Sequence, residues 1–499
     1  MKNILDTVHG HILLREEYLE KIIDTPEFQR LRRIEQSPIR SVYPSARHDR
    51  FIHSLGVYHI GQMIVNQLSS EKDGWRIDVD FESIAQSYLL ACLLHDVGHA
   101  PFSHTLEKYY GNKMQLAKAL ANAVDSDEFN NDLQGKEQEA NFHEYVSAWV
   151  AIRRFASEIS SMGGRPEFVA RMIIGLFYQD KDKHQIDNCM ISLLHGEVID
   201  ADRLDYTCRD VWASGYHTSS YDLKRLISAL HIRKKVEDND YVVCFDSNVV
   251  NEIDNVMTVK DFQMKYVFNH HTVIYDQYLL TSAVEKTAFN LFGSKFKNVY
   301  KEKCDIVAAS TNELCSIDSM LSPLQVGNMK LVNPSDGDFI CLMKQDEDNE
   351  CFKEWYSRRY TRFAIWKTPD EFAGFFQIKR NQSIEHPDFE TEVLAALKNY
   401  GLAADDVLIK KATYKPKVLL KSLYILVHKE LKRFTEIYPD EDSKADIVFY
   451  YVYVKKPNDN SDEIEKIRKK LIEVLEPVMH RLYPEIYIHF GSHNEKPVT

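Results

Sequence analysis

The sequence predicts a mainly α-helical fold with a small α+β region near its C-terminal end. Among 499 residues there are only 18 glycines and 15 prolines, and 44% of the residues are hydrophobic. This composition favours helices around a large core over a turn-rich sandwich or a disordered chain. Residues 447–454 are instead dense in β-branched and aromatic side chains, which is typical of a buried strand.

The length suggests more than one domain, and we expect three segments along the chain. Residues 1–230 should hold an N-terminal segment and a helical core. Residues 231–367 should complete that core with a β-hairpin and further helices. Residues 368–499 should form the small α+β region.

Most of residues 15–230 is expected to be helical. Residues 81–94 are apolar nearly all round, which predicts a helix buried on every side. Residues 125–140 are polar and contain Gly135, which predicts a surface loop. Pro166 is well placed to open a helix that continues to Phe177.

The later elements are more mixed. Residues 232–245 alternate around Asp238-Asn239-Asp240, which predicts a β-hairpin, and helices should resume over residues 252–290. Near the C-terminus, Asn460 is expected to cap a helix with Glu463 as its capping-box partner.

Charge and cysteine content limit the classes of function. The net charge is −13, and an acidic surface repels nucleic acid and anionic membranes at long range. No pair among the eight cysteines has CxxC spacing, and no segment is apolar and long enough for a signal peptide or a membrane span. We therefore expect a cytoplasmic protein that associates neither with membranes nor with nucleic acid.

One short segment indicates chemistry. Residues 95–104 read HDVGHAPFSH, so three histidines and an aspartate follow directly after the apolar helix. Imidazole and carboxylate together suit a borderline divalent ion. His95 and Asp96 alone do not make a site, and His53 and Asp202 are the candidates for the other ligands. The four span about 150 residues, so only a folded helical bundle could bring them together.

Each piece alone has a simpler interpretation. A single histidine at the end of an apolar helix is more often a core residue than a ligand, and the charged run from Asp200 to Asp205 is typical of a solvated face. The combination favours a metal, because an aspartate straight after an apolar run is costly to bury without a cation.

These motifs resemble those of the HD-superfamily deoxynucleoside triphosphate (dNTP) triphosphohydrolases, above all the branch that carries SAM and HD domains. The resemblance begins at residues 6–11 (DTVHGH), continues at 23–32, 50–56 and 200–210, and weakens after about residue 230. It implies a helical HD-domain core with no SAM domain before it. It also implies that His53, His95, Asp96 and Asp202 hold one divalent ion (Mn, Mg, Fe, Zn or Ni), with a second ion left open.

The resemblance assigns roles to further residues. His99, His104, Glu107 and His143 match the catalytic cluster beside the metal. Arg50 and Arg203 should face the phosphates, although the family usually has lysine at the second position. Gln36, Tyr206 and Asp210 match residues that hold the sugar and its 3′-hydroxyl; without the resemblance all three would be taken as structural.

The chain departs from the family after the expected hairpin. Val259, Gln263 and Val267 stand where the family has an arginine, a histidine and a tyrosine that hold the outer phosphates and the sugar. The candidates to take over these contacts after a shift in register lie nearby: Lys260, Lys265, Tyr266 and His270.

Some members of the family are activated by nucleotides bound between subunits. Asp24, Gln29 and Arg32 match the pattern that reads a guanine nucleotide, and Arg225, Arg358 and Arg362 fall where the family has basic regulatory residues. The alternative for Arg358 and Arg362 is an ordinary solvated helix face. Activation would imply a homo-oligomer, either a dimer or a tetramer.

The leading hypothesis is hydrolysis of dNTPs to deoxynucleoside and inorganic triphosphate, with a nucleotide as substrate and as a candidate activator. The departure at residues 259–267 keeps a second hypothesis open, a phosphohydrolase or phosphodiesterase that acts on another nucleotide or a nucleic acid. A third is a nucleotide-sensing scaffold with a vestigial site, against which the complete ligand set argues.

Overall fold

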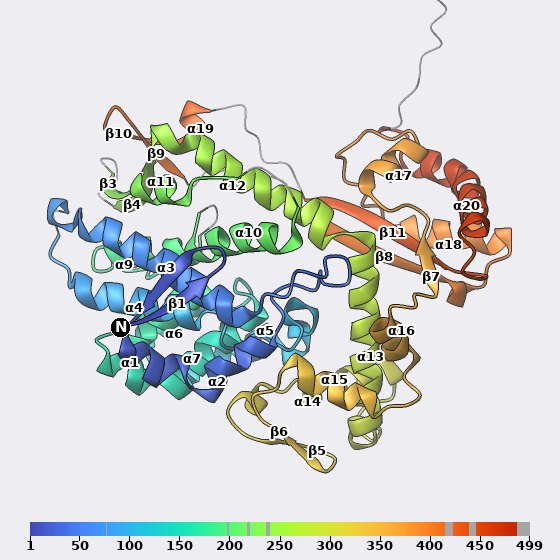
Figure 1. Ribbon diagram of the computed structural model, residues 1–499, viewed down its shortest axis with the longest axis horizontal. Helices are drawn as coiled ribbons and strands as arrows, with labels where there is room; N and C mark the ends of the chain where they lie inside the picture. The colour runs from blue at the N-terminus through green and yellow to red at the C-terminus, as the bar shows by residue number, and fades with distance from the viewer. Residues whose placement is uncertain are drawn as a thin grey trace, which may run out of the picture. The chain divides into compact units, whose positions relative to one another are not determined.

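The computed structural model describes residues 1–75, 77–196, 199–216, 220–235, 240–414, 423–438 and 446–486. Within them the fold is mainly helical, which confirms the predicted class (Figure 1). The chain forms two compact units. Unit 1 contains residues 1–263, 277–353 and 417–443, and unit 2 contains residues 264–276, 354–416 and 444–499. Each unit combines segments that are far apart in the sequence. The three expected segments instead follow one another along the chain, and the division into these three segments stays a prediction.

The centre of unit 1 is a group of three helices. The helix α3 (Arg50–Ser69) packs against both α4 (Phe81–Leu94) and α10 (Ala201–Ser214). All of α4 is buried except Glu82 and Ser83, which confirms the predicted central helix. An all-round apolar helix reaches this state only when other helices cover every face.

Further helices surround this group in unit 1. The longer ones are α5 (Lys113–Val124), α6 (Asp127–Leu133), α7 (Phe142–Ser161), α8 (Pro166–Ile174), α9 (Gln185–Leu194), α12 (Val250–Phe262), α14 (Lys303–Leu314) and α15 (Asp336–Lys344). The helix α7 begins with a capping box, in which Asn141 N donates to the carboxylate of Glu144 over 2.6 Å.

Two local predictions in this unit were wrong. The expected surface loop at 125–140 contains α6, because Ser126 caps the helix and Phe129 and Leu133 are buried against the core. The helix opened by Pro166 ends at Ile174 rather than Phe177, because Gly175 takes the left-handed conformation with φ of 68°.

Unit 1 also contains two sheets that bear on the site. The strands β1 (Lys2–Asp6) and β2 (Gly10–Leu14) form an antiparallel hairpin at the N-terminus. The other sheet has the order β10-β9-β4-β3. Its strands β3 (Leu230–Lys234) and β4 (Tyr241–Asp246) pair antiparallel as predicted, although turn residues 236–239 lie outside the described residues. Its other pair comprises β9 (Tyr424–Val427), which is parallel to β4, and β10 (Glu430–Arg433).

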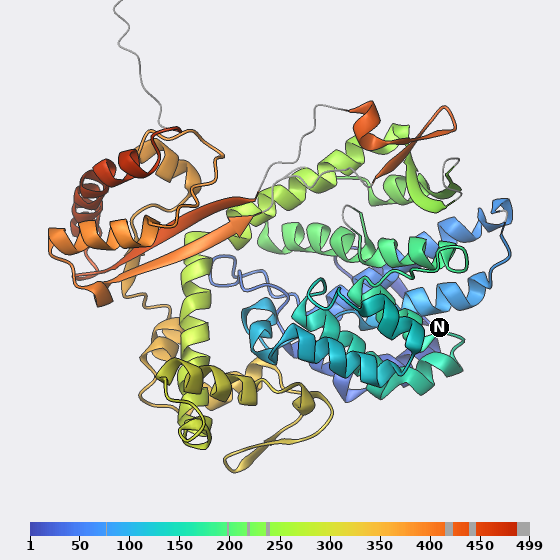
Figure 2. The same ribbon diagram turned by 180° about the vertical axis from the view of Figure 1, so that it is seen from behind.

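Unit 2 is the predicted α+β region. Its antiparallel sheet has the order β7-β11-β8, formed by β7 (Arg362–Ala364), β11 (Ile447–Lys455) and β8 (Val407–Tyr414), with α18 (Phe389–Tyr400) and α20 (Ser461–Leu482) beside it (Figure 2). β11 is buried over residues 447–454, as predicted. Asn460 caps α20, but Glu463 accepts from Asn458 Nδ2 instead of closing a capping box.

The units share α13 (His271–Phe296), which continues the chain after α12 and a π-helical turn at residues 263–268. No helix in the described part of the chain combines the length and apolar character that a membrane span requires.

Candidate metal centre and catalytic cluster

The structure brings the four predicted metal ligands together inside unit 1. His53 lies in α3, Asp202 in the first turn of α10, and His95 and Asp96 at the end of α4. His53, His95 and Asp96 are buried, and their ligand atoms lie within 4.8 Å of one another. The packing of α3 against α4 and against α10 therefore brings these four side chains together.

The distances within this group fit one divalent ion. His53 Nε2 lies 3.3 Å from His95 Nε2, and each lies 3.6 Å from Asp96 Oδ2. Asp202 Oδ1 lies 3.0 Å from His53 Nε2 and 3.7 Å from His95 Nε2. Ligands about 2.1 Å from a tetrahedral ion are about 3.4 Å apart, so the donor atoms need only small shifts to bind it.

The outer ring nitrogens of both histidines have acceptors. His95 Nδ1 lies 2.9 Å from Cys92 O, and His53 Nδ1 lies 2.7 Å from Asp205 Oδ2. Each Nδ1–H is therefore donated away from the group, which leaves both Nε2 atoms facing it. This orientation is typical of histidines that ligate a metal.

The electrostatics of the group also favour a cation. Burial opposes ionisation of Asp96, but the charges of Arg50, His95 and His53 outweigh burial and hold the pKa of this carboxyl well below its usual value. Burial by itself lowers the pKa of His53, yet hydrogen bonds to Asp202 and Asp205 outweigh it and raise that pKa to about 10. The carboxylates thus draw positive charge to the position that a metal ion would take.

The turn after α4 is shaped for close packing. The regular helix ends at Leu94, so His95 and Asp96 belong to a turn. A Cβ on Gly98 would lie 2.3 Å from the backbone nitrogen of Ser147 in α7. Only glycine allows this approach, so the missing side chain serves packing.

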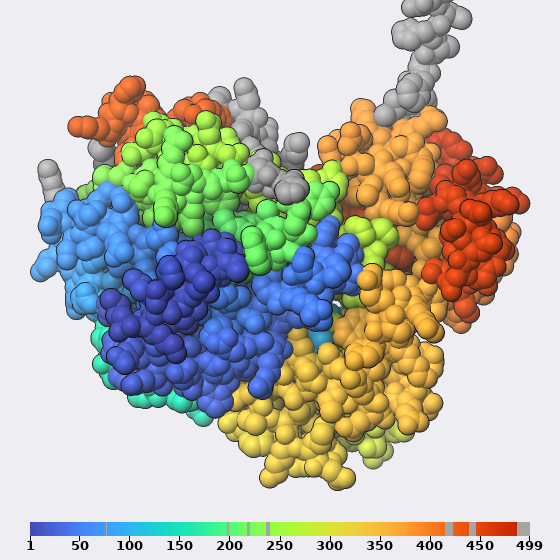
Figure 3. Space-filling view, in the orientation of Figure 1, coloured from blue at the N-terminus to red at the C-terminus, as the bar shows by residue number. Residues whose placement is uncertain are grey.

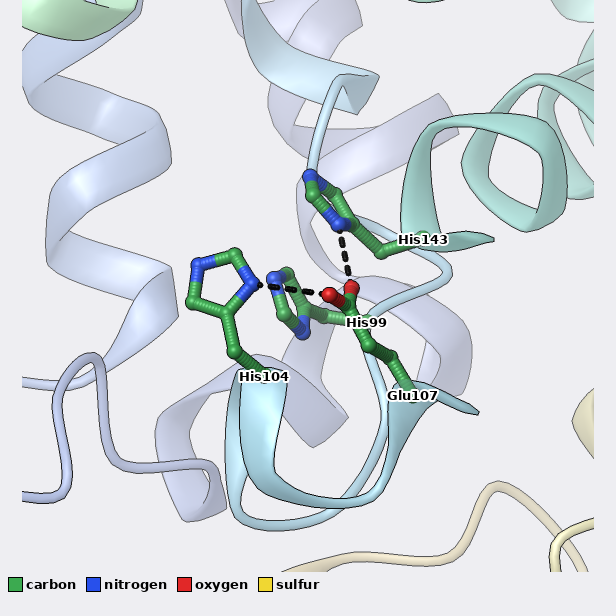
Figure 4. A group of neighbouring side chains, drawn as sticks. All are labelled: His99, His104, Glu107 and His143. Carbon is green, nitrogen blue, oxygen red and sulfur yellow. Dashed lines mark hydrogen bonds and ion pairs between the residues drawn. The ribbon is translucent and has the colours of Figure 1, made fainter. Parts of the chain in front are cut away.

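A second group of polar side chains lies beside this turn (Figure 4). The predicted catalytic residues His99, His104, Glu107 and His143 form it. His143 Nδ1 lies 2.6 Å from Glu107 Oε2, and His104 Nδ1 lies 3.2 Å from Glu107 Oε1. The rings of His99 and His143 are stacked with centroids 4.3 Å apart. By distance these residues could also hold a metal ion, which agrees with the second ion left open by the sequence.

Two histidines of the second group have pKa values shifted in opposite directions. Burial and the charges of Arg50, His143 and His104 hold the pKa of His99 well below its usual value. Burial would also lower the pKa of His143, but its hydrogen bond to Glu107 outweighs burial and raises that pKa. His99 is therefore a neutral base, while His143 favours the protonated state.

The loop that carries His104 has an unusual backbone. Phe102 and Ser103 both have positive φ, 57° and 54°, which costs about 1–3 kcal/mol for each residue. The buried carboxylate of Asp336, at the start of α15, accepts hydrogen bonds from Phe102 N over 2.7 Å and from Glu35 N over 2.9 Å. Asp336 thus holds the loop in this conformation.

The predicted phosphate contact Arg50 is already engaged. Its Nη1 donates to Asp96 Oδ2 over 2.6 Å, its Nε to Ser103 Oγ over 2.9 Å, and its Nη2 to Gln36 O over 3.1 Å. Arg50 is therefore the buried counter-charge of Asp96, a predicted metal ligand, and its contact with phosphate stays a prediction.

The predicted sugar contacts lie on neighbouring elements. Asp210 in α10 is buried and bonds to His48 Nε2 at 2.7 Å and to Ser37 Oγ at 3.4 Å. Within the described part of the chain, the side-chain oxygen of Gln36, next to Ser37, is buried without a hydrogen-bond partner. The structure thus places Gln36 and Asp210 in one region, and it adds His48, which the sequence analysis did not single out.

Arg203 lies one residue after the metal ligand Asp202. Its Nη2 donates to Gly196 O over 3.2 Å, while Nε and Nη1 are buried without a hydrogen-bond partner among the described residues. The pKa of the neighbouring Tyr206 hydroxyl is raised to about 12, chiefly by burial. Tyr206 thus stays neutral.

The last predicted substrate contact, Tyr266, belongs to unit 2. Its hydroxyl donates to Asp370 Oδ2 over 3.1 Å. The departures Val259 and Gln263 are buried in unit 1, and Gln263 Nε2 donates to Thr207 O over 3.0 Å. Gln263 therefore contacts the helix that carries Asp202.

The candidate regulatory residues fall into separate places. Gln29 and Arg32 bond to each other over 2.9 Å, and Gln29 Nε2 donates to Ile23 O, next to Asp24. Arg225 instead donates to Asn248 O over 2.7 Å. Arg358 and Arg362 lie in unit 2, where Arg362 is in β7 rather than on the alternative helix face. An activating role for all six stays a prediction.

A buried charged group behind His53 was not predicted from the sequence. It consists of Asp205 and Arg209 in α10, with Asp6 and His9 in the N-terminal hairpin. The i, i+4 spacing of Asp205 and Arg209 was a readable signal for an ion pair on one helix face. Nothing in the sequence showed that His53 would lie beside it.

Comparison with known proteins relates part of the chain to one domain family. Residues 50–207 match the HD domain family. The chain is 29% identical over 269 residues to the uncharacterized protein YwfO of Bacillus subtilis, which covers 54% of this chain and 51% of that protein. It is 27% identical over 304 residues to the deoxynucleoside triphosphate triphosphohydrolase SAMHD1 of Gallus gallus, which covers 60% and 47%, respectively.

The human SAMHD1 is 44% identical over a shorter stretch of 108 residues, which covers 21% of this chain and 17% of that protein. Among solved structures, a hypothetical protein from Aquifex aeolicus matches with a TM-score of 0.55 and 21% identity, covering 95% of this chain and 99% of that chain. At this identity the likeness shows the fold alone. The present chain spans about half the length of the first curated relatives that it matches.

Proposed function

We propose that this chain, whose residues 50–207 match the HD domain family, is a metal-dependent phosphohydrolase that cleaves dNTPs to deoxynucleoside and inorganic triphosphate. The observation that carries the proposal is a pair of neighbouring groups with complementary chemistry. One group has the donor set for a divalent ion, and the other contains His99, whose two ring nitrogens are buried without a hydrogen-bond partner among the described residues. Buried polar atoms without partners are costly and are expected where a substrate completes them.

We assign metal binding, phosphate binding and proton transfer to different residues. A divalent ion held by His53, His95, Asp96 and Asp202 would supply a Lewis acid for a phosphoryl oxygen. Arg203 binds phosphate oxygens with its buried Nε and Nη1, which have no geometric hydrogen-bond partner among the described residues.

His99 and His143 handle protons. The neutral ring of His99 accepts a proton from the attacking water. His143, which Glu107 keeps protonated through Nδ1, donates from Nε2 to the leaving oxygen. A neutral and a protonated histidine side by side are the forms that a general base and a general acid need before the reaction.

Product analysis tests this proposal. The purified protein is incubated with each dNTP and each NTP in the presence of Mn²⁺ or Mg²⁺, with and without GTP. We expect deoxynucleoside and intact triphosphate as products, and dependence on GTP would support the activator site at Asp24, Gln29 and Arg32. If no triphosphate is cleaved with either metal, the proposal fails.

The same analysis decides the second candidate function. Val259 and Gln263 replace an arginine and a histidine expected to hold the outer phosphates, and both are buried. This favours a substrate with fewer phosphates. Release of a nucleoside monophosphate from a cyclic nucleotide or an oligonucleotide, with no cleavage of dNTPs, would establish a phosphodiesterase instead.

Substitution of His99 should separate catalysis from metal binding. We expect His99→Gln to lower kcat by about 10²-fold or more, because general acid–base groups contribute at least this factor. The affinity of the group formed by His53, His95, Asp96 and Asp202 for Mn²⁺, measured by isothermal titration calorimetry, should stay at the wild-type value, and only a second binding event, if wild type shows one, should be lost. The matched control is His184→Gln, another buried histidine, which bonds Asp187 over 2.7 Å. Equal activity of His99→Gln and wild type would contradict the assigned role.

A further inference from the structure

Asp205 is the central residue of the buried charged group behind His53. Its Oδ2 lies 2.7 Å from His53 Nδ1, and its Oδ1 lies 2.6 Å from His9 Nε2. Arg209 donates to both oxygens, from Nε over 2.8 Å and from Nη2 over 2.9 Å. Asp205 has no exposed surface, so the carboxylate is saturated by two histidines and one arginine.

Arg209 connects this carboxylate to the N-terminal hairpin. Its Nη1 and Nη2 donate to the two oxygens of Asp6, over 2.9 Å and 3.2 Å. Asp6 is the last residue of β1, and its Oδ2 also accepts from His9 N in the turn over 2.9 Å. One carboxylate therefore closes the hairpin turn and binds the arginine that holds Asp205.

The local packing is adapted to this group. A Cβ on Gly56, one turn after His53 in α3, would lie 1.9 Å from Asp205 Oδ1 and 2.5 Å from Arg209 Nη2. Glycine at this position makes the room that the ion pair occupies. The space that a side chain would take on α3 is thus occupied by Asp205 Oδ1 and Arg209 Nη2.

The hairpin lies at the surface of unit 1, where it is seen in dark blue (Figure 3). Leu5 is exposed, whereas Asp6 is buried. The hairpin packs on α3 through β2. A surface element thus sends two side chains inward: His9 contacts Asp205 directly, and Asp6 contacts Asp205 through Arg209.

We propose that Asp6, Arg209 and Asp205 are positioning residues of the metal centre, so that docking of the N-terminal hairpin sets the affinity for the metal. The inference rests on the proposed metal site. A carboxylate that accepts from Nδ1–H fixes the tautomer and the orientation of a ligating histidine and makes its Nε2 a stronger donor. Arg209 fixes the carboxylate, and Asp6 fixes Arg209 while balancing its charge.

The test measures metal binding, not turnover. Metal-free wild type, Asp205→Asn and Asp6→Asn are titrated with Mn²⁺ and with Zn²⁺ by calorimetry. We expect Asp205→Asn to weaken binding about 10- to 100-fold, and Asp6→Asn to weaken it by a smaller factor. In ¹H–¹⁵N spectra of histidine-labelled protein, the hydrogen-bonded Nδ1–H proton of His53 should be present in wild type and shifted or lost in both variants.

The matched control is Asp187→Asn. Asp187 is also a buried carboxylate that accepts two bonds from an arginine, Arg165, and one from a histidine, His184. Its substitution should lower thermal stability and leave both the metal affinity and the His53 signal unchanged. If Asp205→Asn or Asp6→Asn loses more metal affinity than Asp187→Asn, the additional loss is specific to the contacts among Asp6, Arg209 and Asp205.

The outcomes separate this inference from the proposed function. If wild type binds neither metal, the proposed metal-dependent function fails, while the His53 signal still decides whether Asp205 and Asp6 position that ring. If wild type binds metal and Asp6→Asn matches it in affinity and in the His53 signal, the inference is overturned. Should Asp205→Asn not fold, Asp6→Asn, which is one step further from the ligand, decides alone.

Discussion

Replacement of Asp96 by asparagine should abolish hydrolysis, with a loss of about 10⁴-fold or more in kcat/KM. Asp96 Oδ2 lies 3.6 Å from both ligating histidine nitrogens and is held in place by Arg50. Asparagine keeps the shape but removes the negative charge that a divalent ion requires. Several kcal/mol of transition-state stabilisation by the ion then disappear, and about 5.5 kcal/mol corresponds to 10⁴-fold in rate.

The measurement combines turnover with metal content. Asp96→Asn should retain far less Mn²⁺ than wild type after gel filtration, as measured by mass spectrometry of the metal. Asp187→Asn, a buried aspartate paired with Arg165, serves as the control and should keep both metal and activity. A variant that retained metal and more than a tenth of wild-type activity would show that Asp96 is not a ligand.

Replacement of Arg50 by methionine should cause the largest loss of stability, about 3–5 kcal/mol in the free energy of unfolding. Arg50 is buried and neutralises Asp96 over 2.6 Å, and removal of one partner of a buried pair leaves the other charge uncompensated. Ser103 Oγ and Gln36 O lose a donor in the same step. Denaturant titration of the metal-free protein measures this effect.

Metal should partly reverse this loss, because a bound cation replaces the missing counter-charge of Asp96. The control Arg225→Met removes an exposed arginine that pairs with Glu252 at 3.3 Å, and such pairs contribute less than about 1 kcal/mol. An unfolding free energy for Arg50→Met within 1 kcal/mol of wild type would mean that Asp96 is not ionised in the metal-free protein.

Some of this protein could be predicted from the sequence because the information is local. The apolar run at residues 81–94 predicts a buried helix, and the histidine and aspartate directly after it can be buried only with a cation or with paired charges. Residues 447–454 predict a buried strand for the same reason, since β-branched and aromatic side chains suit a covered sheet. The structure confirms both elements.

Local patterns failed where a few contacts decide the outcome. Residues 125–140 are polar overall, so a loop was expected, but Phe129 and Leu133 contribute enough burial to hold α6. The end of α8 depends on one glycine with positive φ. Helix propensity is a weak preference that single tertiary contacts override.

The sequence by itself determined the mainly helical class and the residue types that suit a divalent ion. Only the tertiary structure decided how those residues are supported: Asp6, His53, Asp205 and Arg209 meet although about 200 residues separate the first from the last. The physical reason is that a ligand's chemistry belongs to its side chain, whereas its orientation and charge balance depend on neighbours from other elements. Such neighbours are brought together by the packing of α3, α10 and the N-terminal hairpin.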